Sequence, residues 1–397
     1  MNRLIAFITF IFSLSASAQV WKTLPKGVRI LGYRNVTTSK VTKNYDRFRS
    51  ETPLGKEITI DAKTLNEAIG GGLETALPKE VFNELMVGQY AVDASAQFNV
   101  QGMGFGYGLT KKVMFYAEIA YYKAQVNANL KRTKGNNYEK SAQLCEESSS
   151  GSFDTTICAN LRQLIDIDEK SVQSFVTSQY GYQPLGKWEG AGYGDMETGL
   201  MINVLDKGYT GILFYPGVIL PTGRVDDPDI IQDVGFGDGQ YDLFSEIGTG
   251  YVFNDYISFG TTFRYTYQAP GSVDLRLDSE QNQKGSFDVK YGDKISLMVN
   301  STISFNDWLS ITPIYRYMRQ QATTYDSPYV NDNAALATNS DRFEHQAQLT
   351  TTISSIQPFL KKKFILPAQI NFNLVQTMDG KNVPKVGRFE LELRMLF

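Results

Sequence analysis

The sequence predicts an all-β protein, a transmembrane antiparallel β-barrel of about 12 strands with long extracellular loops and short periplasmic turns. Three observations predict it: apolar and polar residues alternate with period two, an export signal opens the chain, and no later run of about 18 apolar residues could form a transmembrane helix. The 42% hydrophobic content argues against disorder. The net charge of −3, with 39 Lys and Arg against 42 Asp and Glu, argues against a nucleic-acid partner.

Residues 1–18 are expected to be a secretory signal peptide. Arg3 supplies a positive start, an apolar stretch runs from Leu4 to Leu14, and the Ala-Ser-Ala sequence at 16–18 is a small-residue cleavage site. Cleavage after Ala18 leaves Gln19 as the mature N-terminus. We therefore expect export to the outer membrane of a Gram-negative bacterium, and one barrel domain over residues 19–397.

The alternation is clearest in the last segment. Odd positions from Phe389 to Phe397 are apolar, and even positions from Arg388 to Arg394 are charged. Successive strand side chains point to opposite faces, so one face meets lipid and the other the barrel interior. Aromatic residues gather near strand ends, as in interfacial girdles. The expected strands cover residues 27–38, 89–108, 113–130, 193–206, 209–223, 240–254, 256–270, 286–305, 308–324, 342–360, 364–377 and 386–397.

Short turns alternate with long loops along this list. An even number of strands places both termini in the periplasm. The last strand must pair with the first, because a sheet edge in hydrocarbon would leave backbone groups unpaired. Phe98 and Val100 occupy even positions, whereas Met103 and Phe105 occupy odd ones, which predicts a β-bulge near residues 100–103.

Two short motifs carry a narrower resemblance. Leu220-Pro221-Thr222-Gly223 ends one strand, and Gly-Asp-Gly-Gln-Tyr-Asp at 237–242 opens the next. This pattern resembles the outer-membrane proteins of phenol meta-pathway degradation, which are similar to the FadL-like long-chain fatty-acid transporters. The resemblance implies passive uptake of small, often apolar compounds. Only Gln19 to Lys26 precede the first strand, so we expect no N-terminal plug of the fatty-acid-transporter type.

The C-terminal pattern is also familiar. Its alternate apolar residues, with Phe389 upstream and Phe397 at the end, look like the signal read by the barrel assembly machinery. Such endings are widespread among outer-membrane barrels and identify the class of protein rather than its substrate.

Charged residues on the polar strand faces are the candidate lumen-lining residues. A charge facing lipid costs about 2–4 kcal/mol at the bilayer midplane, so these side chains are expected inside. Two interpretations stay open: a selectivity surface around water, or a salt-bridged network that fills a narrow barrel. The candidates are Glu118, Asp195, Glu197, Glu246, Arg264, Lys290, Lys294, Arg316, Glu344, Arg388, Glu390, Glu392 and Arg394.

Cys145 and Cys158 lie in the longest loop of an exported chain, which predicts one disulfide. Helices are expected after Asp61, a good N-cap, and from Leu77 to Leu85 with Pro78 at its first position. His345 is the only histidine, and the alternation puts it on the outward face. We expect no enzyme activity, metal site or cofactor.

Together these features predict an outer-membrane channel for passive diffusion or uptake of small solutes, including hydrophobic or aromatic compounds. The alternatives are a general polar-solute porin and a closed structural or adhesive barrel with no transport role. The expected partners are outer-membrane lipid and lipopolysaccharide, the barrel assembly machinery and small-molecule solutes. A homo-oligomer stays open, and no nucleic acid is expected.

Overall fold

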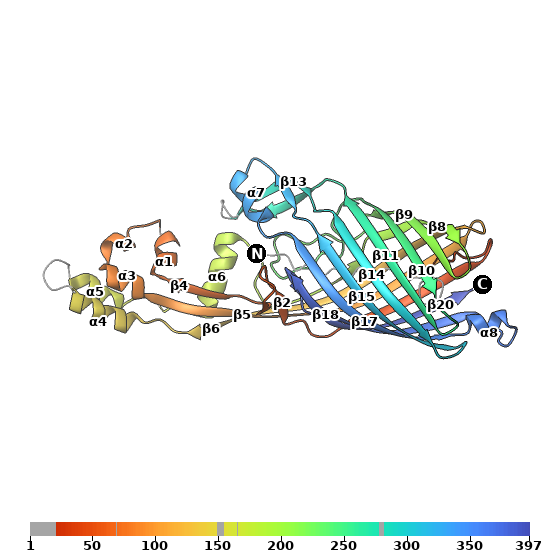
Figure 1. The fold of residues 1–397 in the computed structure, drawn as a ribbon. Coiled ribbons are helices and arrows are strands. Elements are labelled where there is room, and N and C mark those ends of the chain that lie inside the picture. Colours follow the sequence, from red (N-terminus) through yellow and green to blue (C-terminus); the bar gives the residue numbers. More distant parts are fainter. Residues whose placement is uncertain (1–20, 69, 149–154, 165, 278–281) are drawn as a thin grey trace. The chain divides into compact units, whose positions relative to one another are not determined.

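The computed structural model describes residues 21–68, 70–148, 155–164, 166–277 and 282–397 (Figure 1). The expected signal peptide lies outside these residues. The chain divides into two compact units, whereas the sequence predicts a single domain. The barrel unit comprises Met1–Thr52, Ala96–Val126 and Trp188–Phe397, and the hairpin unit comprises Pro53–Ser95 and Asn127–Lys187.

The largest sheet has 14 strands, and 12 of them form a closed antiparallel wall. The order around the wall is β5-β1-β20-β18-β17-β15-β14-β11-β10-β9-β8-β6, and a β5–β6 pairing closes it. The other two strands are β4 (Glu57–Asp61) and β7 (Lys187–Tyr193). The wall strands are β1 (Arg29–Thr38), β5 (Met86–Gly108), β6 (Val113–Lys134), β8 (Met196–Asp206), β9 (Thr210–Leu220), β10 (Asp242–Val252), β11 (Ile257–Gln268), β14 (Lys294–Ser304), β15 (Leu309–Gln320), β17 (Arg342–Ser354), β18 (Ala368–Lys381) and β20 (Gly387–Leu396).

The predicted fold class and strand number are confirmed, and so is the pairing of the last strand with the first. In β1, Ile30 lies opposite Leu396 of β20. The predicted bulge near residues 100–103 is wrong, because β1 and β5 keep a continuous register through that region. Phe98 and Val100 are buried on the inward face with Gly102. On the inward face of β5, apolar side chains are followed by glycine, whereas the alternation of inward and outward positions continues unchanged.

The two faces of the wall differ as a membrane requires. On β20, the outward Phe389 and Leu393 are 45% and 40% exposed, whereas Glu390 and Arg394 on the other face are each 5% exposed. No helix in the described part of the chain is long and apolar enough to cross a membrane.

Two small sheets and two helices belong to the connections of the barrel unit. One sheet is β12 (Gly271–Arg276), β13 (Lys284–Lys290) and β16 (Thr324–Asp326), with α7 (Val330–Ala337) beside it. The other is β2 (Lys43–Tyr45), β3 (Glu51–Pro53) and β19 (Val383–Pro384), and α8 (Ile356–Leu360) follows β17. The expected strand 286–305 is interrupted between β13 and β14. Gly292 lies so close to Gln321 that a Cβ there would meet its carbonyl oxygen at 2.0 Å.

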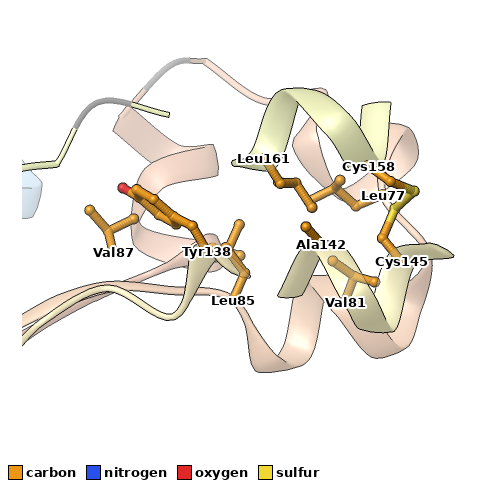
Figure 2. Packing of buried hydrophobic residues seen from close by; sticks show 10 residues of the cluster. Leu77, Val81, Leu85, Val87, Tyr138, Ala142, Cys145, Cys158 and Leu161 are labelled. Atoms are coloured by element: carbon orange, nitrogen blue, oxygen red, sulfur yellow. A yellow bond between two sulfur atoms is a disulfide. The ribbon is translucent and has the colours of Figure 1, made fainter. Parts of the chain in front are cut away.

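The hairpin unit has its own apolar core (Figure 2). Its helices are α1 (Ala62–Ala68), α2 (Leu73–Ala76), α3 (Lys79–Glu84), α4 (Tyr138–Ser148), α5 (Thr155–Leu161) and α6 (Glu169–Tyr180). Asp61 accepts a hydrogen bond from the backbone N–H of Thr64 at the start of α1, and Pro78 is the N-cap residue of α3 rather than its first residue. Cys145 and Cys158 form a disulfide between α4 and α5, beside Val81 and Leu161.

We predict that replacing both cysteines by serine destabilises the hairpin unit locally. A cross-link over a loop of this length removes unfolded-state entropy equivalent to about 3 kcal/mol. Hydrogen exchange should therefore quicken in α3, α4 and α5, while the exchange of barrel strands such as β14 stays unchanged. Equal protection of α4 with and without the cysteines would contradict the prediction.

Candidate lumen and solute-binding site

Arg264 organises one ion-paired network on the inner wall. Its Nε donates to Glu246 Oε2 at 2.8 Å, and its Nη1 lies 2.9 Å from Glu197 Oε2. The guanidinium also stands 4.1 Å from the ring centroid of Phe244. Tyr116 completes the network by donating to Glu197 Oε1. These side chains come from β6, β8, β10 and β11 and are all buried.

A second network joins β1, β18 and β20. Arg388 donates to Glu390 at 2.6 Å, and Arg394 lies 2.6 Å from Glu392. Arg34 of β1 reaches Glu392 at 3.2 Å. The sequence analysis missed Arg34, because β1 alternates poorly and its two arginines, Arg29 and Arg34, give no period-two pattern. Pairing of β1 with β20, which places Arg34 opposite Glu392, is the signal that identifies it.

The remaining inward candidates lie on neighbouring strands. Glu118 is opposite Glu197 in the β6–β8 pairing, Glu344 accepts a hydrogen bond from Thr377, and Arg316 lines an internal cavity with Asn300. Lys294 bonds Asp242 at 3.3 Å near the loop end of β10.

Lys290 is not part of the inner wall. It lies on β13, its ammonium pairs with Asp293, and it stands 4.7 Å from the ring centroid of the outward-facing Tyr267. The expectation was wrong because the period-two pattern continues through residues 291–293, where the chain leaves the wall.

Asp195 differs from the other candidates because it lies between strands, in the β7–β8 connection. Its Oδ1 accepts from the backbone N–H of Gly223 at 2.8 Å, and its Oδ2 accepts from that of Asp238 at 3.2 Å. It therefore joins the two motifs that carry the family resemblance. Burial, with some repulsion from Asp238 and Asp242, raises the pKa of Asp195 to about 6.

The segment before β1 enters the inner wall near the β8–β9 turn. Trp21 is fully buried, its Nε1 donates to Asp206 at 3.1 Å, and its carbonyl accepts from Asn203 at 2.5 Å. Gly211 makes room for the indole, since a Cβ there would lie 2.2 Å from Trp21 Cδ1. The sequence analysis did not predict this contact, in which the segment before β1 places one indole inside the wall.

Trp21 belongs to an apolar cluster, which we call the aromatic chamber. It is built by inward side chains from five wall strands and by the segment before β1. Its buried members are Trp21, Leu24, Ile30, Met114, Tyr116, Met201, Leu213, Tyr215 and Phe244.

The outward wall has a different feature, an apolar depression of about 700 Å³. Its lining includes Leu31, Phe105, Ile119 and Leu393. Gly32 lies directly opposite Gly104 in the β1–β5 pairing, so the inner face is bare at this level. The inward glycines thus mark a place where the wall is thin.

His345 lies on the outward face, where its Nδ1 is 2.6 Å from the hydroxyl of Tyr315 and its ring contacts Tyr317 and Phe343. This group is an outward-facing aromatic cluster of the kind that barrels place at membrane interfaces. Within the described residues, no group of three or more His, Cys, Asp or Glu side chains could hold a metal ion.

The fold and inner wall define a β-barrel of the outer membrane. No family model and no curated relative matches the chain. Among solved structures, the COG4313 outer membrane channel from Pseudomonas putida F1 is similar with a TM-score of 0.56 and 11% identity, over 95% of this chain and 98% of that one. The TodX monoaromatic hydrocarbon channel mutant matches at TM-score 0.36 and 12% identity, over 94% and 91%. A Pseudomonas aeruginosa FadL homologue matches at 0.34 and 7%, over 96% and 92%.

We predict that Arg264→Gln lowers the free energy of unfolding by about 3–5 kcal/mol, because Glu197 and Glu246 would lose their shared buried cation. Denaturant titration of the detergent-solubilised barrel measures this change. Arg319→Gln, at an exposed outward position of β15, is the matched control and should stay within about 0.5 kcal/mol of the native protein. Equal losses in the two variants would show that the Arg264 network does not stabilise the barrel.

The raised pKa of Asp195 predicts a pH effect. A carboxyl that holds its proton more tightly when folded makes unfolding easier as pH rises between about 4 and 6, by up to about 3 kcal/mol. Asp195→Asn should remove this component. The measurement is the difference in unfolding free energy between the native protein and the variant at pH 4 and pH 7. If the difference in unfolding free energy is the same at pH 4 and pH 7, the predicted effect of Asp195 is contradicted.

Proposed function

We propose that the protein is an outer-membrane channel for small aromatic solutes, which pass the aromatic chamber when the segment carrying Trp21 moves. The observation that carries this proposal is the indole of Trp21, which is buried inside the wall and whose residue is held by two hydrogen bonds to β8. Trp21 belongs to one buried cluster with Met114, Tyr116, Leu213 and Phe244. Those side chains would contact an aromatic solute equally well once the indole leaves.

The contacts that hold the segment are consistent with movement. Trp21 is fixed by two hydrogen bonds, and Thr23 Oγ1 meets the Lys111 carbonyl only at 3.4 Å. An aromatic solute in the chamber recovers the apolar burial that Trp21 would give up, about 25 cal/mol per Å². Exchange of one ring for another therefore has a small net free-energy change. The COG4313 channel of similar fold supports a channel role for this architecture.

A general polar-solute porin is the second candidate, and the two ion-paired networks favour it. Charges on an inner wall can line water as well as stabilise a barrel. The two candidates differ in the solute: a porin passes sugars and aromatic compounds of equal size alike, whereas the proposed channel prefers rings.

We predict that Trp21 reports aromatic solutes directly. Trp188→Phe with Trp308→Phe leaves Trp21 as the only tryptophan of the three. Titration of this protein in detergent with phenol should quench and red-shift the Trp21 emission to saturation, because the indole moves from a buried site towards water. Glucose at the same concentration should leave the emission unchanged.

Trp21→Ala supplies the transport arm of this test. It should raise phenol uptake into proteoliposomes above the native rate and lower the unfolding free energy by about 3 kcal/mol. Trp308→Ala, which removes a partly exposed tryptophan outside the chamber, should change neither. Unchanged emission together with unchanged uptake would contradict the proposed function.

A further inference from the structure

Arg316 stands apart from the other inward arginines. Arg34, Arg264, Arg388 and Arg394 each have an ion pair with a carboxylate between 2.6 and 3.9 Å. Within the described residues, Arg316 has no ion pair, and its buried Nε has no hydrogen-bond partner. A buried guanidinium N–H with no partner costs free energy, so this position can accept a bound anion.

A small cavity of about 20 Å³ in front of Arg316 offers further hydrogen-bonding groups. Its lining includes Arg34, Asn300, Thr312 and Asn373 from β1, β14, β15 and β18. Guanidinium, amide and hydroxyl groups are donors that suit an oxyanion. The carboxylates that also line the cavity already face their own arginines, since Glu390 pairs with Arg388 and Glu392 pairs with Arg34 and Arg394.

Charge is unevenly divided around the inner wall. The side made by β1, β20, β18, β17 and β15 carries the guanidinium groups of Arg34, Arg316, Arg388 and Arg394 against the carboxylates of Glu344, Glu390 and Glu392. The side made by β6, β8, β10 and β11 carries Arg264 against Glu118, Glu197 and Glu246. In the strand order, β20 and β1 stand opposite β10 and β11, so the field runs across the barrel.

We propose that Arg316 is the anion-recognition residue of the lumen and that the preferred solutes are small aromatic carboxylates. The carboxylate binds Arg316, and the ring passes the aromatic chamber at another part of the inner wall. This inference rests on the proposed function for the ring and on Arg316 for the charge. A guanidinium binds a carboxylate through two parallel N–H donors, which gives it an advantage over a point charge.

The test compares benzoate with benzamide, a neutral molecule of the same shape, by calorimetric titration of the detergent-solubilised protein at pH 7.5. The native protein should bind benzoate about tenfold or more tightly than benzamide. Arg316→Gln should lose that advantage and keep its affinity for benzamide. The benzoate affinity of Arg316→Lys should lie between that of the native protein and that of Arg316→Gln. This variant keeps the test valid if Arg316→Gln does not fold. Arg319→Gln, on the outward face of the same strand, should behave as the native protein.

A second arm identifies the source of the anion. Bi-ionic reversal potentials in planar bilayers, with potassium benzoate facing potassium chloride, should show a benzoate preference that Arg316→Gln abolishes. If chloride at equal concentration competes fully with benzoate, the site is for inorganic anions and the carboxylate assignment is overturned. Equal binding of benzoate and benzamide by the native protein overturns the role of Arg316 but does not contradict the proposed channel function. If neither molecule binds and phenol leaves the Trp21 emission unchanged, the proposed function itself is contradicted.

Discussion

The structure depends on one constraint: inside hydrocarbon every backbone N–H and C=O must find a partner within the protein. A sheet meets this condition only when it closes, and here β1 does so by pairing with both β20 and β5. Closure fixes the rest of the inner wall. It brings Arg34, near the start of the chain, opposite Glu392, near its end, and so creates an ion-paired network from segments that have no local relation.

The alternation of apolar and polar residues with period two determines which features could be predicted from the sequence. The outward and inward faces of β20 and β11 were predicted correctly, because a charge on the lipid face would be costly and the alternation is unbroken. Lys290 was misplaced for the same reason: a turn at residues 291–293 happens to keep the alternation while the chain leaves the wall. Periodicity shows which residues share a face only within one strand.

The features that the sequence analysis missed are long-range contacts of single residues. Trp21 is buried by Asn203, Asp206 and Gly211, which follow it by more than 180 positions, and a lone tryptophan before a strand has no pattern. Asp195 was predicted as a wall charge, yet its carboxylate accepts backbone N–H groups of Gly223 and Asp238. The motifs around these two positions were visible in the sequence. Their physical link, a carboxylate from another segment, was not.

Strand length explains why the chain needs a second core. A tilted strand crosses the bilayer with about 9–11 residues, whereas β5 has 23 and β6 has 22. Both strands are about twice as long as a crossing requires, and a two-stranded ribbon on its own is only marginally stable in water. The hairpin unit supplies the missing stability through contacts that the ribbon cannot make itself: an apolar cluster around Val81 and Leu85, and the cross-link between Cys145 and Cys158. The disulfide and the helices are therefore consequences of the length of β5 and β6. The Arg264 and Arg34 networks belong to the barrel unit, whereas the disulfide belongs to the hairpin unit, so the two sets of interactions stabilise different parts of the chain.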